Sequence, residues 1–257
     1  MDAAGAMFAE VLGTEGIWLL VVGVVLAGLV RGFSGFGAAM IYLPLAGQVL
    51  PPFEALTTLF IMDLFGPLPN LPRALRDGHP DDVARLGLGM ILTIPLGVGL
   101  LTVIGAEVFR YSVSLLSLGL LVLLIAGVRY HGKLRRRMIY LAGGIGGFLA
   151  GSVGVPGPPV IMLYMASPHP PSVIRANTLL FLLLADIAML AVLGLGGMLV
   201  WRAVAIGLML ALPNLLANIA GAAIFRPEYE QSYRAAAYLI IAVAALTGLP
   251  LFDGVLG

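Results

Sequence analysis

Residues 28–45 of the chain read GLVRGFSGFGAAMIYLPL. Apolar residues flank this stretch on both sides, yet it holds four glycines within ten positions and one arginine. Glycine at this density ends a helix, exposes backbone N–H groups and lets a ligand approach the main chain closely. The stretch therefore predicts a break inside an apolar element.

The same pattern returns in the second half, where residues 147–162 read GFLAGSVGVPGPPVIM. Three glycines recur at an offset of 119 residues (147 minus 28): Gly28 and Gly147, Gly32 and Gly151, Gly35 and Gly154. Two broken apolar segments at corresponding positions of the two halves are the best sequence indication of a transporter's binding site.

The composition is that of a membrane protein. Of 257 residues, 60% are hydrophobic and 11% are charged, and the mean hydropathy is +1.06. Soluble domains carry about 25% charged residues, so an ordinary globular protein is excluded. Long apolar segments between short polar loops predict an all-α polytopic membrane protein, because a helix satisfies its own backbone hydrogen bonds in lipid. Residues 1–16 lack Lys and Arg, so we expect no cleaved signal peptide.

Several kinds of chemistry are not expected. The chain has no cysteine, which excludes disulfides, thiolate metal sites and cysteine nucleophiles. His79, His131 and His169 fall in predicted loops, far apart and without metal-ligand spacing, so neither a metal nor another cofactor is expected. No histidine lies in a predicted span to serve an intramembrane protease, so we expect no enzyme. The expected partners are a small anion and the lipid bilayer, not nucleic acid, and a homodimer stays open.

The two halves of the chain follow one plan. The N-terminal half, residues 1–132, has a broken element at 17–50 and spans at 53–71, 86–106 and 112–128. The C-terminal half, residues 133–257, has a broken element at 138–166 and spans at 176–194, 204–225 and 235–251. The first apolar run, residues 17–30, is too short to cross alone. Thr57-Thr58-Leu59 recurs as Asn177-Thr178-Leu179, so the repeat continues beyond the glycines.

Charge in the loops predicts the topology. We expect the protein in the inner (plasma) membrane. Residues 129–137 hold five of the fourteen basic residues and should face the cytoplasm. An N-terminus without Lys or Arg is expected outside, so each broken element must enter and return on one side as a helical hairpin. Each half is then a hairpin followed by three transmembrane helices, and the repeats are inverted. The alternative is a single crossing by each broken element, which gives parallel repeats.

The paired glycine-rich segments and the Thr-Thr-Leu and Asn-Thr-Leu sequences that follow them resemble the twin motifs of the TauE/SafE family of sulfite and organosulfonate permeases. The resemblance covers nearly the whole chain in length, repeat plan and motif placement. It implies secondary transport of a small sulfur-containing anion such as sulfite or sulfoacetate. An anion channel or a membrane-embedded subunit of a larger complex is the alternative.

The chain departs from the family's usual run of consecutive glycines at both motifs. Ala38-Ala39 follows Gly37, and Pro158-Pro159 follows Gly157. The two prolines lack N–H donors that the family pattern would offer, so the two copies are not expected to contribute equally.

The candidate site lies at the two breaks. Exposed N–H groups at the start of a half-helix carry partial positive charge and can hold an oxyanion near the bilayer midplane, and nearby hydroxyls could add donors. The substrate-binding candidates are Arg31, Ser34, Gly35, Gly37, Ala38, Thr57, Thr58, Ser152, Gly154, Gly157, Asn177 and Thr178. The alternative for the glycines is close helix packing through small-xxx-small patterns.

Three charges lie within apolar segments, where charge is costly and usually functional. Arg31 could bind a sulfonate through a bidentate contact, lie near the interface, or pair with a carboxylate. Asp63 and Asp186 are the carboxylates well inside predicted spans. Because burial disfavours the charged form of a carboxylate, either could bind a coupling proton. The alternatives are capping a helix, pairing with Arg31 or Arg175, and, for Asp63, an interfacial position if its helix ends near Pro67.

Polar side chains in other spans have two interpretations. Thr57, Thr58, Asn177 and Thr178 can donate to an anion, although Asn and Thr within membranes more often bond neighbouring helices. Asn214 and Asn218 share one face of the predicted span 204–225, where they line the pathway or join helices.

Overall fold

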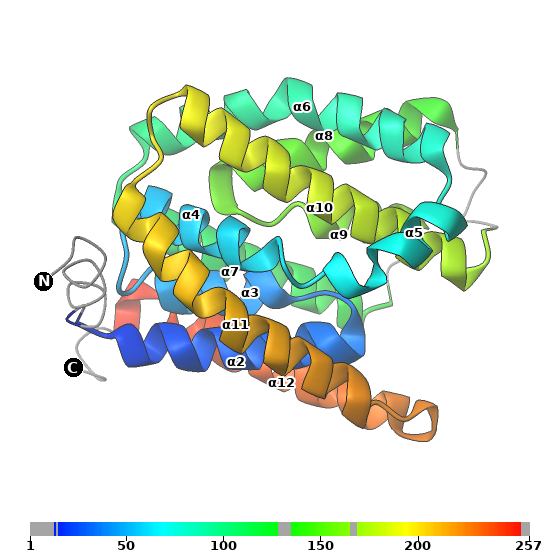
Figure 1. The fold of residues 1–257 in the computed structure, drawn as a ribbon. Coiled ribbons are helices and arrows are strands. Elements are labelled where there is room, and N and C mark those ends of the chain that lie inside the picture. The colour runs from blue at the N-terminus through cyan, green and yellow to red at the C-terminus, as the bar shows by residue number, and fades with distance from the viewer. Residues whose placement is uncertain (1–12, 14, 128–134, 165–168, 253–257) are drawn as a thin grey trace, which may run out of the picture. The chain divides into compact units, whose positions relative to one another are not determined.

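The structure is a computed structural model that describes residues 13, 15–127, 135–164 and 169–252. Every regular element in these ranges is a helix (Figure 1), in agreement with the predicted all-α polytopic membrane protein. Within them five helices are long and apolar enough to cross a membrane: α2 (Ile17–Ser34), α6 (Pro80–Val103), α7 (Ala106–Ile125), α10 (Pro171–Leu195) and α11 (Trp201–Ile224). Most of the basic segment 129–137 lies outside the described residues, as does the N-terminal segment 1–12.

Shorter helices complete the described chain. They are α3 (Ala38–Ala46), α4 (Pro52–Asp63), η1 (Leu68–Asn70), α5 (Leu71–Asp77), α8 (Arg136–Val153), α9 (Gly157–Tyr164), η2 (Pro227–Tyr229), α12 (Glu230–Thr247) and η3 (Pro250–Phe252). The first apolar run does not end at residue 30 but continues to Ser34, so the prediction that it is too short to cross is wrong.

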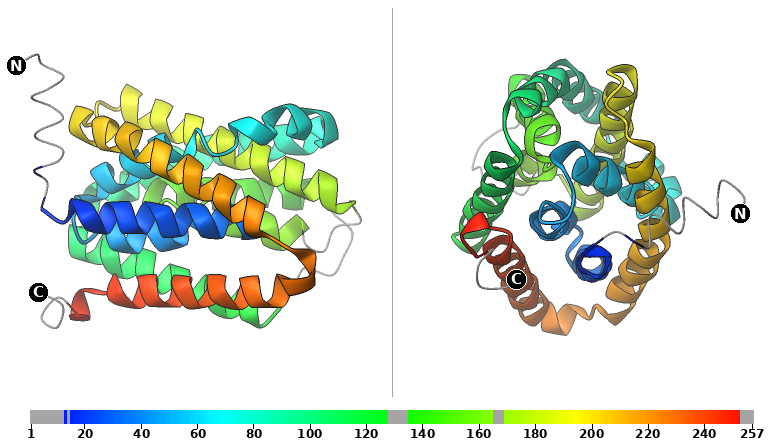
Figure 2. Two further views of the ribbon diagram at one scale, coloured as in Figure 1. Left: turned by 60° about the horizontal axis from the view of Figure 1, so that its bottom comes forward. Right: turned by 90° about the vertical axis from the view of Figure 1, so that its left-hand side faces the viewer.

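The helices form two compact units that cut across the sequence halves. The first unit comprises Met1–Gly66, Gly105–Leu121 and Gly196–Gly257, and the second comprises Pro67–Ile104 and Val122–Leu195. In the first unit α2 packs along α11, which Figure 2 shows in blue and orange. In the second unit α8 packs along α6. Each unit therefore joins the broken element of one half to a full span of the other half.

Both breaks are made by a glycine in the left-handed conformation. Gly35 (φ 79°) ends α2 and donates its N–H to the Arg31 carbonyl at 2.8 Å. Gly154 (φ 72°) ends α8 and donates its N–H to the Ala150 carbonyl at 3.1 Å. Glycine adopts this conformation without the clash that a Cβ would bring. The two copies of the motif thus share one local geometry.

The first broken element folds back on itself. Gly37 (φ 94°) precedes α3, which then returns along α2. A Cβ on Gly23 would lie 3.2 Å from the Leu45 side chain, and one on Gly16 would lie 2.9 Å from Val49. Positions near the start of α2 therefore lie beside positions near and beyond the end of α3, so the two helices run antiparallel.

The remaining repeated glycines of the first unit allow close helix packing. A Cβ on Gly28 would lie 2.7 Å from the backbone oxygen of Asn214 and 2.8 Å from the side chain of Ala217. A Cβ on Gly32 would overlap the backbone oxygen of Asn218. Here α2 and α11 approach at the level of their backbones, as small residues permit in membrane helices.

The second unit repeats this packing with other residues. A Cβ on Gly147 would overlap the backbone oxygen of Met90 and the Thr93 side chain, and one on Gly151 would overlap the Ile94 backbone oxygen. The contacted positions of α6 and α11 therefore correspond at an offset of 124 residues (214 minus 90, 218 minus 94). The sequence repeat is also a repeat of packing.

The halves differ in the helix that follows each break. The sequence predicts one span over residues 53–71, but α4 stops at Asp63 and a turn over 64–67 precedes η1 and α5. Gly66-Pro67 accounts for the stop, because proline lacks an N–H and disfavours helix in the residue before it. The corresponding α10 is continuous over 25 residues.

Candidate functional site

The first unit brings two of the predicted charges together. Arg31, in the last turn of α2, forms an ion pair with Asp63, the last residue of α4, between Nη1 and Oδ1. The two side chains are 9% and 12% exposed. Two charges this far from water are tolerated because each neutralises the other, and loss of either partner would leave a costly buried charge.

The turn that follows Arg31 is held by the Ser34 side chain, and Gly35 within it is exposed. The Ser34 hydroxyl contacts the carbonyls of Val30 (2.7 Å) and Phe36 (2.8 Å) and accepts the N–H of Phe36 (3.3 Å). A Cβ on Gly35 would meet nothing within 4 Å, so the main chain there is open to approach. Ala38 is buried at the first position of α3.

The threonines of α4 are engaged within the first unit. Both Thr57 and Thr58 are completely buried. The Thr57 hydroxyl donates to the Phe53 carbonyl at 2.7 Å, and the Thr58 hydroxyl donates to the Ala55 carbonyl at 2.9 Å. Thr58 also accepts a hydrogen bond from the Tyr42 hydroxyl at 2.9 Å, which joins α3 to α4. Thr58 therefore joins two helices, whereas Thr57 bonds only within α4.

The second unit has an equivalent contact at Asn177. Its side chain is completely buried, accepts the backbone N–H of His79 at 2.7 Å and donates to the Tyr164 hydroxyl at 3.2 Å. In both units, therefore, a tyrosine of the short helix after the break is hydrogen-bonded to a polar residue of the next long helix: Tyr42 to Thr58, and Tyr164 to Asn177. Thr178, the neighbour of Asn177, is half-buried.

Other predicted residues of the second unit lie apart from that contact in α8, the second break and α10. The buried Ser152 hydroxyl donates to the Phe148 carbonyl at 2.8 Å within α8. Gly154 forms the break, and Gly157 begins α9. Asp186 is 2% exposed in α10.

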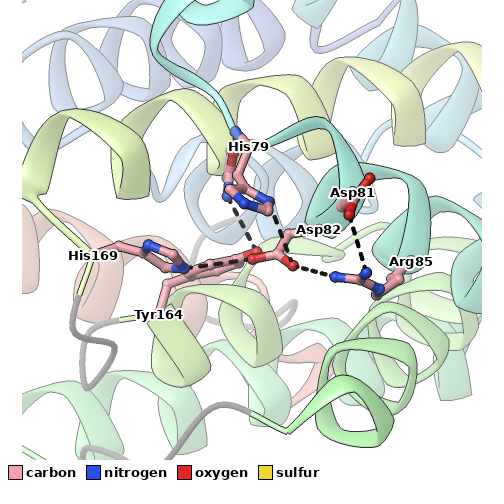
Figure 3. A network of polar contacts seen from close by, with 7 residues as sticks. His79, Asp81, Asp82, Arg85, Tyr164 and His169 are labelled. Carbon is pink, nitrogen blue, oxygen red and sulfur yellow. Dashed lines mark hydrogen bonds and ion pairs between the residues drawn. The ribbon is translucent and has the colours of Figure 1, made fainter.

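A polar network in the second unit was not predicted from the sequence (Figure 3). Its centre is the Asp82 carboxylate, which is 4% exposed at the start of α6. Arg85 Nη1 lies 2.8 Å from Asp82 Oδ1, His79 Nδ1 lies 3.8 Å from the same oxygen, and His169 Nε2 lies 3.5 Å from Oδ2. Arg85 also contacts the exposed Asp81 at 3.3 Å.

The prediction that the histidines lie far apart is wrong for two of them. The rings of His79 and His169 are 5.8 Å apart between centroids. They meet because the start of α10 lies beside the start of α6, a tertiary contact that a separation of 90 positions (169 minus 79) does not reveal. The third, His131, lies outside the described residues. In the part of the chain that the structure describes, no group of three or more His, Cys, Asp or Glu could hold a metal ion.

Among the described residues, five helices long and apolar enough to cross a membrane are those of a multi-pass helical membrane protein, and two glycine-broken elements at corresponding positions are typical of transporters. The chain belongs to the TauE/SafE family, because the family model described as Sulfite exporter TauE/SafE matches residues 19–247. This confirms the resemblance seen in the sequence. The family consists of membrane transporters of sulfite-type anions and not of enzymes. A search of curated proteins and of solved structures found no match.

Proposed function

We propose that the protein is a proton-coupled secondary transporter of a small sulfur-containing oxyanion or organosulfonate, such as sulfite or sulfoacetate. The observation that carries this proposal is the buried pair of Arg31 and Asp63 beside the open turn at Gly35. The residue expected to bind the anion and one of the residues expected to bind the proton are thus in direct contact.

The charge balance of the pair supplies a coupling mechanism. With Asp63 ionised, its carboxylate occupies the Arg31 guanidinium and the pair carries no net charge. A proton on Asp63 removes this competitor, and an anion in its monovalent form, such as hydrogensulfite or singly protonated sulfoacetate, can then bind the guanidinium, which again leaves no net charge. A proton alone or an anion alone would leave one uncompensated buried charge, which is costly. Proton and anion therefore bind together and leave together.

The first break supports anion binding better than the second. At Gly37 and Ala38 the backbone N–H groups at the start of α3 lie within a few residues of Arg31 along the chain and carry partial positive charge. At the second break Pro158 and Pro159 follow Gly157 and offer no N–H. We therefore place the main contacts at the first break. The hydroxyls of Ser34, Thr57, Thr58 and Ser152 would have to exchange their present hydrogen bonds to reach an anion.

The proposal includes inverted repeats, with residues 129–137 in the cytoplasm of a cell with this protein in its inner membrane. The antiparallel packing of α2 and α3 supports a hairpin. His169 and Asp82 belong to loops that the charge pattern assigns to the same side, and they lie in contact. Trp18 and Trp201, both more than half exposed, lie at the starts of α2 and α11, which fits helix ends at a membrane surface, because tryptophan is enriched at both interfaces.

Counterflow in proteoliposomes tests the transport activity. Vesicles loaded with unlabelled sulfite or sulfoacetate should accumulate the labelled anion transiently against its gradient, which a channel cannot do. Arg31→Ala should abolish this accumulation, while Arg73→Ala, which removes an exposed arginine paired with Asp77, should leave it unchanged. A wild-type protein that equilibrates the label without overshoot would contradict a carrier.

A further inference from the structure

Asn214 of α11 reaches across to the end of α4. Its side chain is completely buried, and its Nδ2 donates a hydrogen bond to the backbone carbonyl of Met62 at 3.1 Å. Met62 directly precedes Asp63, the last residue of α4 and the partner of Arg31. The amide therefore binds the main chain one residue before the carboxylate proposed to take the proton.

The end of α4 needs such a donor. The last carbonyls of a helix have no partner within the helix, and inside a membrane there is little water to bond them. The turn that ends α4 bonds the Asp63 carbonyl through the N–H of Gly66 at 3.3 Å. The Met62 carbonyl is bonded by Asn214 instead, so a residue from another helix fixes this end.

The second unit provides an internal comparison. Asn214 of α11 corresponds to Met90 of α6. Gly28 packs against the backbone of Asn214, and its counterpart Gly147 packs against the backbone of Met90. Met90 is equally buried but has no amide. The counterpart of α4 in this unit is α10, which also packs against α6 and continues past the corresponding position without a break, so its carbonyls there need no outside donor. At this pair of corresponding positions, a side-chain amide is thus present in the unit where α4 ends and is replaced by Met90 in the unit where α10 continues.

We infer that Asn214 is a positioning residue that holds the end of α4 so that the Asp63 carboxylate faces Arg31. This inference rests on the proposed function, because it assigns Asn214 to the proton-binding side of that mechanism. Asn214 contacts neither proton nor anion. Loss of the Asn214 amide should let the end of α4 move. Binding of a proton by Asp63 would then no longer be tied to binding of the anion by Arg31.

The test compares Asn214→Leu, which has similar volume but no donor, with Asn214→Gln, which keeps the donor. The control is Asn70→Leu, which makes the same kind of change at an exposed asparagine whose side chain caps no helix. Each purified variant is reconstituted, and labelled sulfite is followed in two assays: accumulation driven by a pH gradient, and exchange at equal pH. Size-exclusion profiles and thermal stability identify folded protein, and Asn214→Ala serves if Asn214→Leu does not fold.

We expect Asn214→Leu to lower proton-driven accumulation about tenfold, as the loss of one buried hydrogen bond suggests, and to shift its dependence on pH. Exchange at equal pH should persist, Asn214→Gln should recover much of the coupling, and Asn70→Leu should behave as wild type. Equal loss of both activities in folded Asn214→Leu, or coupling as in wild type, would overturn the inference alone. A wild-type protein without proton-driven accumulation would overturn the proposed function as well.

Discussion

At the scale of single residues, the buried ion pair is the main feature that the sequence left open. Arg31 and Asp63 were each singled out as charges in apolar segments, and pairing was one of the alternatives. The structure shows the pair. Their separation of 32 residues (63 minus 31) could not reveal it, because the contact depends on α3 turning back and on α4 ending early. The network of Asp82 with His79 and His169 was also missed, because it depends on a tertiary contact between the starts of α6 and α10.

The ion pair predicts a non-additive effect on stability. Arg31→Gln should lower thermal stability markedly, because loss of one partner of a buried pair costs about 3–5 kcal/mol. Arg31→Gln combined with Asp63→Asn should be less harmful than Arg31→Gln alone, since no uncompensated charge remains. The thermal melting temperatures of Arg31→Gln, Asp63→Asn and the double variant in detergent measure this effect. Additive losses would mean that the two side chains do not stabilise each other.

At the scale of elements, the repeated glycines divide into two groups. The sequence predicted the break and its repetition but could not say which glycines pack and which turn, because both roles favour the same residue. The structure assigns Gly28 and Gly32 to packing and Gly35 and Gly154 to the left-handed ends of helices. The predicted span 53–71 runs past the end of α4, although an end near Pro67 was among the alternatives considered for Asp63.

The packing glycines predict a graded loss of stability. Gly28→Ala should cost about 1–3 kcal/mol, the range for overpacking, because its Cβ would contact Asn214 and Ala217 at less than 3 Å. Gly119→Ala, where a Cβ would meet nothing within 4 Å, is the control and should be neutral or slightly stabilising. Similar thermal shifts for both variants would contradict close packing of α2 on α11.

The turning glycine Gly37 predicts a loss of affinity beyond its strain. Gly37→Val forces a branched side chain into a positive φ, with its Cβ 3.5 Å from the side chains of Ile241 and Val30, and we expect it to crowd an anion held at the start of α3. Gly197→Val imposes similar strain at φ 66° in open space and is the matched control. Anion affinity should fall about tenfold for each lost contact in Gly37→Val only. Equal affinities in the two variants would place the anion elsewhere.

At the scale of the whole molecule, the sequence halves and the compact units do not coincide. Hydropathy and glycine spacing predict helices and a repeat, since both depend on local sequence. Each compact unit combines helices from both sequence halves, because α2 packs on α11 and α8 packs on α6. No local sequence pattern encodes these contacts. The resulting units are alike in construction but differ in α4 and α10.

Inverted repeats predict specific sides for two loops, and the absence of cysteine allows direct labelling. Gly196→Cys should react with an impermeant maleimide from outside, and Glu228→Cys only after the membrane is opened. A single crossing by each broken element reverses both results. Glu107→Cys, outside under either topology, is the control for accessibility. Labelling of Glu228→Cys in intact cells would contradict the hairpins.

The most direct test of proton coupling through the ion pair is flux in proteoliposomes containing wild-type or Asp63→Asn protein. Labelled sulfite is measured under an imposed pH gradient and, separately, in exchange at equal pH. Asp63→Asn should abolish accumulation driven by the pH gradient and retain part of the exchange, because an amide can neither release a proton nor compete as an anion for Arg31. Accumulation in Asp63→Asn equal to that of wild type would contradict the account.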